Sequence, residues 1–199
     1  MQKPAQDSQQ EQLLKDIATF LQEAHIPYMV TGSVSSIFYG RPRASHDIDF
    51  IIEAENNESQ RIREVFASLP RREFVVDPLY IEEAVSQKTQ FNIFHLPTGL
   101  KLDFWLLKET SFDKQRFKRR KDVHVFGQTI TFASPEDTIL KKLLWYQESN
   151  SEKHLIDAAF VYQIQKGNLD EVYLQTWAKR HKTTKLLQEI SEIDLEQHY

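Results

Sequence analysis

Two short segments, YMVTGS at residues 28–33 and DIDFII at residues 47–52, are the part of the sequence from which the fold is predicted. Both read as apolar strands, and the first runs through a Gly-Ser pair into a predicted helix. Side chains alternate along a strand, so Asp47 and Asp49 are expected on one face of the sheet. Two like charges held this close repel each other unless a cation lies between them. The pattern therefore predicts a divalent-metal site.

Gly32 and Ser33 stand where the first strand passes into the helix. At such a junction, backbone N–H groups and a hydroxyl can bind phosphate, and glycine permits a close approach to the backbone. A phosphate site together with a metal site is typical of metal-assisted transfer from a nucleoside triphosphate.

A third carboxylate, Asp103, lies in the predicted strand 100–106, which follows a strand over 91–96 after a Pro-Thr-Gly turn. A buried strand rarely carries an unpaired carboxylate, so Asp103 is expected to have a partner. In one interpretation Asp103 binds a second metal ion and accepts the proton of an attacking hydroxyl. The alternative is an ion pair with Lys101 or an arginine. Mg²⁺ is the expected ion because it prefers hard oxygen ligands, and Mn²⁺ is the alternative.

Hydrophobic periodicity predicts a polar tail over residues 1–10, a mixed α/β domain over 11–133 and a helical domain over 134–199. The last begins at Ser134-Pro135-Glu136-Asp137, which is typical of a helix start. The predicted helices cover residues 13–24, 33–39, 58–69, 80–87, a segment from 134 onward, 151–165, 170–180 and 184–193. The predicted strands cover residues 28–31, 47–53, 91–96, 100–106, 123–126 and 129–132.

Composition narrows the class of protein. The chain has 199 residues, 40% hydrophobic and 27% charged, which suits one medium domain or a domain with a smaller one attached. A net charge of −4 argues against nucleic-acid binding over the whole surface. The absence of cysteine excludes disulfides, thiolate zinc sites and cysteine nucleophiles. No apolar run is long enough to cross a bilayer and the N-terminus is polar, so we expect no membrane association and a cytoplasmic location.

Gly32-Ser33, Asp47-Ile48-Asp49 and the later Asp103 resemble the signature of the DNA polymerase β-like nucleotidyltransferase superfamily. From about Leu13 to Leu187 the chain is similar to small bacterial nucleotidyltransferase-like proteins akin to toxins of abortive-infection and toxin–antitoxin systems. The similarity is carried by the blocks IPYMVTGSVSSIFYGRPRASHDIDFII, FNIFHLPTGLKLDFW, SPEDTILKKLLWY and SEKHLIDAAFVYQIQKGNLDEVYLQTWAKR.

This resemblance implies a mixed β-sheet flanked by helices, a C-terminal helical segment, Mg²⁺, and transfer of a nucleoside monophosphate from an NTP to a hydroxyl. It also matches Lys142 to a lysine that often meets the triphosphate. The resemblance supplies no acceptor, so protein, RNA and small molecules all stay open.

Several basic residues have two interpretations. Arg43 and its neighbour Arg41 either steady the triphosphate or are ion-paired or solvent-facing. The run from Lys114 to Lys121 either guides RNA or the triphosphate through its charge, or is a solvated helix face, which we favour.

Other function classes also stay open. The chain is alternatively a catalytically silent nucleotide-binding or antitoxin-type partner, an RNA-binding protein, or an antibiotic-modifying nucleotidyltransferase.

Overall fold

The computed structural model describes residues 5–198, and their contacts divide them into two compact units. Each unit is built from two segments of the chain. The sheet unit comprises Met1–Thr31 and Ser45–Phe132, and the helical unit comprises Gly32–Ala44 and Ala133–Tyr199.

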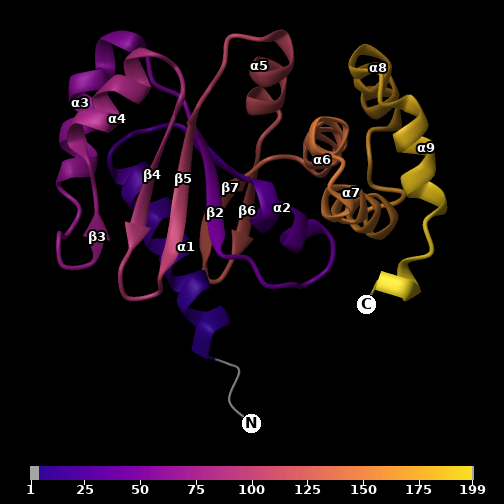
Figure 1. The fold of residues 1–199 in the computed structure, drawn as a ribbon, viewed down its shortest axis with the longest axis horizontal. Coiled ribbons are helices and arrows are strands. Elements are labelled where there is room, and N and C mark those ends of the chain that lie inside the picture. The colour runs from indigo at the N-terminus through magenta and orange to yellow at the C-terminus, as the bar shows by residue number, and fades with distance from the viewer. Residues whose placement is uncertain (1–4, 199) are drawn as a thin grey trace. The chain divides into compact units, whose positions relative to one another are not determined.

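The sheet unit contains a seven-stranded mixed sheet with the strand order β3-β4-β5-β2-β1-β7-β6 (Figure 1). Strand β2 runs parallel to β5 and antiparallel to β1, and β1 runs parallel to β7. This arrangement confirms the predicted mixed α/β fold. The strands are β1 (Tyr28–Thr31), β2 (Asp47–Ile52), β3 (Phe74–Val75), β4 (Gln90–His95), β5 (Leu100–Leu106), β6 (Lys121–Val125) and β7 (Gln128–Phe132). The helices of this unit are α1 (Ala5–Glu23), α3 (Ser59–Ala67), α4 (Pro78–Ser86), α5 (Ser111–Lys118) and a 3₁₀ turn at Asn56–Glu58.

One face of the central strands forms the core of the sheet unit. Phe50 of β2 stacks on Phe104 of β5, with ring centroids 5.2 Å apart. Helix α3 covers them through Phe66, whose ring meets Phe104 edge-on at 4.8 Å and Phe91 at 5.0 Å. Aromatic pairs in these geometries add to the stabilisation from burial. Because these residues are buried, the period of two turns the aspartates of β2 and β5 to the opposite face.

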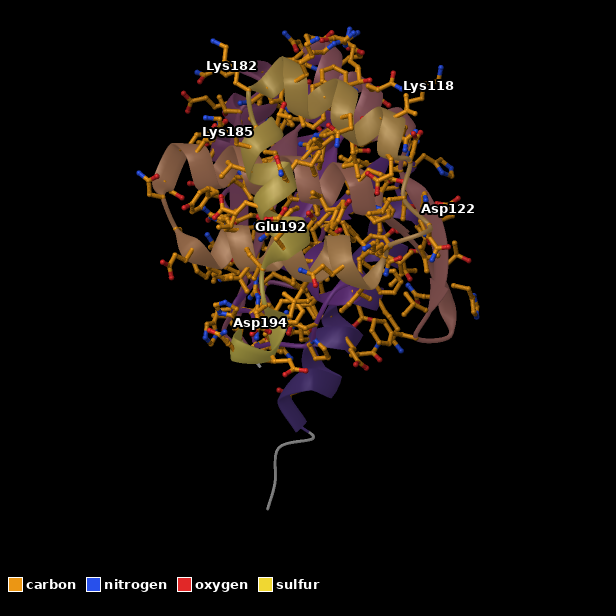
Figure 2. The ribbon with its side chains drawn as sticks, turned by 90° about the vertical axis from the view of Figure 1, so that its right-hand side faces the viewer. Lys118, Asp122, Lys182, Lys185, Glu192 and Asp194 are labelled. Atoms are coloured by element: carbon orange, nitrogen blue, oxygen red, sulfur yellow. The ribbon has the colours of Figure 1, made fainter. Side chains whose placement is uncertain are left out.

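The helical unit consists of α2 (Gly32–Tyr39), α6 (Pro135–Ser149), α7 (Glu152–Ile164), α8 (Glu171–His181), α9 (Thr184–Glu192) and a 3₁₀ turn at Leu195–His198. The Ser134 hydroxyl caps α6 by accepting a hydrogen bond from the backbone N–H of Asp137 at 3.1 Å, as the sequence predicted. Helix α2 joins this unit through Ser35, whose hydroxyl lies 2.7 Å from that of Thr138. Along α9, Lys185 lies near the first turn and Glu192 at the end (Figure 2).

The observed elements differ from the prediction in several places, and helix α5 and the two 3₁₀ turns were not among the predicted elements. Residues 1–4 of the predicted polar tail lie outside the described residues, and residues 5–10 are part of α1, which begins well before 13. The two-residue edge strand β3 was not predicted, because its pairing with β4 is non-local. The basic run does not form one helix, since α5 ends at Lys118 and β6 begins at Lys121.

Candidate functional site

Four charged residues form a compact block on the face of the sheet that carries the aspartates. Strands β2 and β5 are in parallel register, with Asp47 opposite Lys101 and Asp49 opposite Asp103. Neighbouring strands lie about 5 Å apart and alternate residues on one strand about 7 Å apart, so the four side chains occupy the corners of a small rectangle. We call Asp47, Asp49, Lys101 and Asp103 the carboxylate block. The structure thus places the three carboxylates that the sequence predicted on one face of two neighbouring strands.

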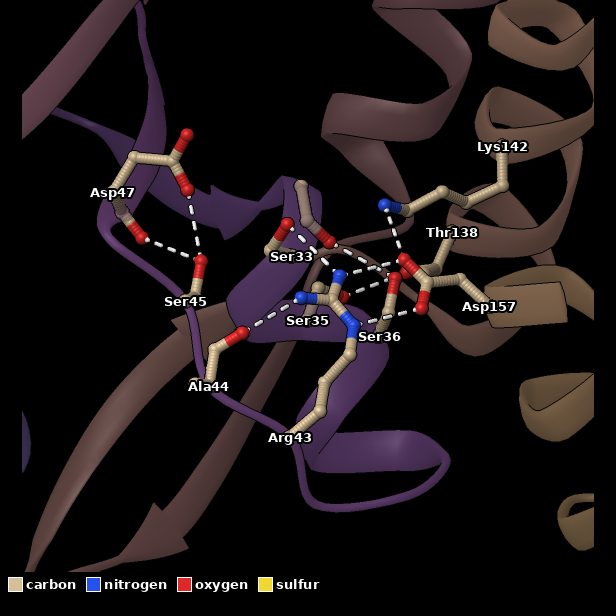
Figure 3. Close-up of polar contacts among 11 residues, drawn as sticks. Ser33, Ser35, Ser36, Arg43, Ala44, Ser45, Asp47, Thr138, Lys142 and Asp157 are labelled. Atoms are coloured by element: carbon tan, nitrogen blue, oxygen red, sulfur yellow. Dashed lines mark hydrogen bonds and ion pairs between the residues drawn. The ribbon is translucent and has the colours of Figure 1, made fainter. Parts of the chain in front are cut away.

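The two carboxylates on β2 each accept a hydrogen bond from a nearby side chain. The Ser45 hydroxyl donates to Oδ1 of Asp47 at 2.8 Å (Figure 3). The Trp105 indole N–H donates a longer bond, 3.4 Å, to Oδ1 of Asp49. Ser45 lies just before β2, and Trp105 lies on β5, two residues beyond Asp103. These donors orient the carboxylates on the sheet, and neither was predicted.

Asp103 is ion-paired with Lys101, whose Nζ lies 2.8 Å from Oδ2 of Asp103. The hydrogen bond to Asp103 is the main cause that raises the pKa of Lys101, and the charges of Asp47 and Asp49 act in the same direction. The predicted need of Asp103 for a partner is therefore met by the ion pair that the sequence left open as an alternative.

The donor set of the carboxylate block suits Mg²⁺ or Mn²⁺, which bind hard carboxylate oxygens. In the part of the chain that the structure describes, no three acidic or histidine side chains converge as a ligand set. Asp47, Asp49 and Asp103 are instead each bonded to a separate donor, Ser45, Trp105 and Lys101 respectively. Asp47, Asp49 and Asp103 would hold the ion once these donors give way, and the metal stays a prediction.

A second group of polar residues lies within the helical unit. The Arg43 guanidinium binds Asp157 with two hydrogen bonds, from Nε to Oδ1 at 2.9 Å and from Nη2 to Oδ2 at 2.7 Å (Figure 3). Lys142 of α6 donates to the same Oδ2 at 2.8 Å, and Arg43 Nη2 also donates to the Ser33 hydroxyl at 3.0 Å. We call Ser33, Arg43, Lys142 and Asp157 the cation cluster. It joins three residues that were predicted to bind nucleotide through one that was not.

Burial makes Asp157 central to the cation cluster. The side chains of Asp157 and Lys142 are only 4% and 2% exposed. Burial by itself would raise the pKa of Asp157, but the hydrogen bonds and charges of Arg43 and Lys142 outweigh it and hold the pKa below its ordinary value. Asp157 is therefore an ionised anchor that fixes both cations. Its signal in the sequence was a single carboxylate in the apolar helical stretch LIDAAF.

Ser33 and Gly32 have roles that follow from local geometry. Because the Ser33 oxygen accepts a hydrogen bond from Arg43, its own O–H hydrogen can be donated to another acceptor. Gly32, the first residue of α2, has φ = +64°, a left-handed conformation that glycine adopts without a steric penalty. The sequence predicted glycine here for close approach to phosphate, and the backbone angle gives a second reason.

The basic run 114–121 is divided among different environments. Arg116 is buried and paired with Asp113 at 2.9 Å, so a solvated helix face describes only part of the run. Lys118 and Arg120 border an open cavity of about 560 Å³ at the surface of the sheet unit, where Figure 2 labels Lys118. The other residues that line this cavity are Gln22, His25, Ile26, Pro27, Tyr28, Asp122 and Thr131.

This cavity lies near the strand ends that are farthest from Asp47. Tyr28 is the first residue of β1 and pairs with Ile52 at the end of β2, whereas Asp47 is the first residue of β2. The basic run also follows the end of β5, beyond Asp103. The cavity is thus lined from β1, β6 and β7, and the carboxylate block lies on β2 and β5.

The model of the AbiEii family, described as a nucleotidyl transferase toxin of type IV toxin–antitoxin systems, matches residues 18–198. No curated protein matches the chain in sequence. None of the described helices is both long and apolar enough to span a membrane.

Solved structures share the fold. A nucleotidyltransferase-like antigenic protein from Paracoccidioides brasiliensis is 18% identical, with a TM-score of 0.53 and 90% of each chain covered. The solution structure of the antibiotic-resistance factor ANT(2'')-Ia is 15% identical, with a TM-score of 0.56, 92% of this chain covered and 98% of that one. At such identities the likeness shows the fold alone. The match of the family model over nearly the whole sequence goes further: the chain belongs to the AbiEii family of nucleotidyl transferase toxins.

Proposed function

We propose that the protein transfers a nucleoside monophosphate from an NTP to a hydroxyl of a protein, an RNA or a small molecule, with Mg²⁺ or Mn²⁺. The observation that carries the proposal is the carboxylate block, in which three aspartates from two paired strands share one face of the sheet. A divalent ion bound there would offset the negative charge that builds up on the transferred phosphate.

In the proposed reaction one bond forms and one breaks at the α-phosphorus, and the chain supplies the base. The acceptor oxygen forms a bond to the α-phosphorus, the bond from the α-phosphorus to the bridging oxygen breaks, and pyrophosphate leaves. Asp103 accepts the proton of the acceptor hydroxyl as the new bond forms.

The cation cluster has the chemistry to bind the triphosphate. The Ser33 hydroxyl donates to a phosphate oxygen, while Arg43 and Lys142 supply positive charge close to it. Asp157 holds the two cations in place before the nucleotide arrives, so little side-chain freedom is lost on binding.

Incubation with each labelled NTP, Mg²⁺ and a host lysate tests the proposal, because it reports donor and acceptor together. We expect label transfer by the wild type and a loss of about a hundredfold or more in Asp49→Asn, since a metal ligand is removed. Glu53→Gln is a matched control, because Glu53 is an exposed carboxyl just beyond the end of β2 and is expected to leave transfer unchanged. Equal labelling by the wild type and Asp49→Asn with every NTP would contradict the proposal.

A silent nucleotide-binding module is the second candidate, and the Lys101–Asp103 ion pair favours it because this pair occupies the proposed base. Calorimetry separates the two functions. A silent module takes up NTP without later release of pyrophosphate, whereas the enzyme releases it in step with transfer.

The small-molecule acceptor class has its own test. One of the similar solved structures is ANT(2'')-Ia in complex with adenylyl-2''-tobramycin, at 15% identity and a TM-score of 0.51, with 87% of this chain covered and 99% of that one. Aminoglycoside resistance in a strain that expresses the protein would favour an antibiotic acceptor over protein or RNA.

A further inference from the structure

Lys101 occupies the fourth corner of the carboxylate block. It stands directly across from Asp47 on the neighbouring strand, is separated from Asp103 by one residue on its own strand, and lies diagonally from Asp49. Its ammonium is 2.8 Å from Oδ2 of Asp103. A cation among three carboxylates is the arrangement that a bound metal ion would otherwise create.

We propose that Lys101 is the resident cation of the block, which competes with a divalent ion for Asp103 and so weakens metal binding to the free protein. The inference rests on the proposed function, because it assumes that the block binds a metal. It goes further because Lys101, which is not one of the proposed metal ligands, would then control the affinity of the block for the metal.

The charge balance of the block supports this competition. Three carboxylates and one ammonium leave two negative charges, so one divalent ion neutralises the block while Lys101 is present. Without the ammonium, three negative charges face the incoming ion. Removal of Lys101 therefore increases the attraction for a divalent cation and removes the group that occupies Oδ2 of Asp103.

The exposed fractions of the two side chains indicate that Lys101, and not Asp103, moves when a metal ion binds. The side chain of Lys101 is 38% exposed, whereas that of Asp103 is only 11% exposed and lies on a central strand. A lysine can move its ammonium into water by rotating its flexible stem, and the strand holds the aspartate in place. The exchange thus moves the ammonium of Lys101 outward, while the backbone of Asp103 stays in its strand.

Mn²⁺ titration of the nucleotide-free protein, with free Mn²⁺ followed by electron paramagnetic resonance, tests the proposal. We expect Lys101→Met to bind Mn²⁺ about tenfold more tightly than the wild type, as the loss of one repulsive charge predicts. Lys101→Arg keeps the charge and should bind like the wild type. Lys108→Met is the matched control, since Lys108 is exposed in the loop just after β5 and makes no ion pair among the described residues.

Without the charge of Lys101, repulsion among the three carboxylates could unfold the sheet unit, so a second variant and a measurement of stability are included. Lys101→Gln retains a polar side chain, and thermal unfolding with and without Mn²⁺ reports on both variants. The proposal predicts a lower Tm than the wild type without Mn²⁺ and a larger rise on its addition.

The outcomes distinguish this inference from the proposed function. Equal Mn²⁺ affinity in the wild type, Lys101→Met and Lys101→Gln, with weaker binding by Asp49→Asn, would overturn the role of Lys101 and leave the metal site standing. Looser binding by both Lys101 variants would overturn it too, because Lys101 would then support the site. No Mn²⁺ binding by any of these proteins would overturn the inference together with the metal part of the proposed function.

Discussion

At the scale of one residue, Asp157 fixes the positions of two basic side chains in the helical unit. It accepts hydrogen bonds from both Arg43 and Lys142, and it is buried with Lys142. A buried ion pair adds little stability compared with an apolar pair, but removal of one partner leaves an uncompensated buried charge. The role of Asp157 is therefore to hold Arg43 and Lys142 in place, and not to contact a ligand itself.

We expect Asp157→Asn to lower the free energy of unfolding by about 3 kcal/mol at neutral pH, because Lys142 loses its buried counter-charge. Urea denaturation followed by circular dichroism measures the change. Glu192→Gln is the control, since Glu192 is exposed at the end of α9 in the same unit (Figure 2), and its replacement should change little. A loss no larger than that of the control would show that Lys142 does not depend on Asp157.

The pH dependence of this difference follows from the lowered pKa of Asp157. An acid whose pKa is lower in the folded state adds stability that is complete above its unfolded pKa, and this stability is lost as pH falls through the folded value. The gap between wild type and Asp157→Asn should therefore be constant above the ordinary aspartate value of 3.8 and should shrink below it. Growth of the gap on acidification would contradict this sign.

At the scale of elements, Gly40 sets how closely the end of α2 approaches α7. A Cβ added at Gly40 would lie 2.8 Å from the carbonyl oxygen of Ser36 and 3.3 Å from side-chain atoms of Phe160 and Val161. The first contact is with backbone, which cannot rotate away. The small residue is thus required by packing inside the helical unit.

Gly40→Ala should cost about 2–3 kcal/mol of folding stability, because the chain must shift to relieve these contacts. Gly127→Ala separates this from a conformational effect. A Cβ there meets nothing within 4 Å, so its positive φ of 81° is the only source of strain and predicts a cost of about 1 kcal/mol. Thermal unfolding of both variants makes the comparison, and an equal loss would indicate that packing at Gly40 is not tight.

At the scale of the whole molecule, the chain crosses between its two units three times. It leaves the sheet unit after Thr31, returns at Ser45 and leaves again after Phe132. The segment Gly32–Ala44 carries Ser33 and Arg43 of the cation cluster, while its helical partners come from the end of the sequence. A single cut in the chain therefore cannot separate the units.

A fragment of residues 1–133 tests this consequence. It retains α2 but lacks α6 and α7, so Ser35 loses Thr138 and the Tyr39 carbonyl loses the amide of Gln165, which donates to it at 2.9 Å. We expect the fragment to bind the dye ANS and to aggregate, because α2 exposes the surface that these helices bury. A monomeric fragment with sharp near-ultraviolet circular dichroism would contradict this expectation.

Local patterns were sufficient for much of the fold. The alternation of Asp47 and Asp49 with Ile48 and Phe50 predicted both the strand and its two faces, because period-two burial is a local property. The start of α6 at Pro135, with Ser134 as its N-cap, was equally predictable from the sequence. The edge strand β3 was not, since it depends on pairing with residues of β4 that local periodicity does not connect to it.

For the candidate site, the sequence by itself singled out Gly32-Ser33 and the three aspartates from their residue types and their places on predicted strands. It offered Arg43 as one of two interpretations of a loop arginine, and Lys142 only through the family resemblance. Only the tertiary structure decided how these groups are paired. The parallel register of β2 and β5 sets Lys101 among the aspartates, and the packing of α7 brings Asp157 to Arg43 and Lys142. The physical reason is that a buried charge requires a partner, and chain segments far apart in sequence supply that partner only when the chain folds.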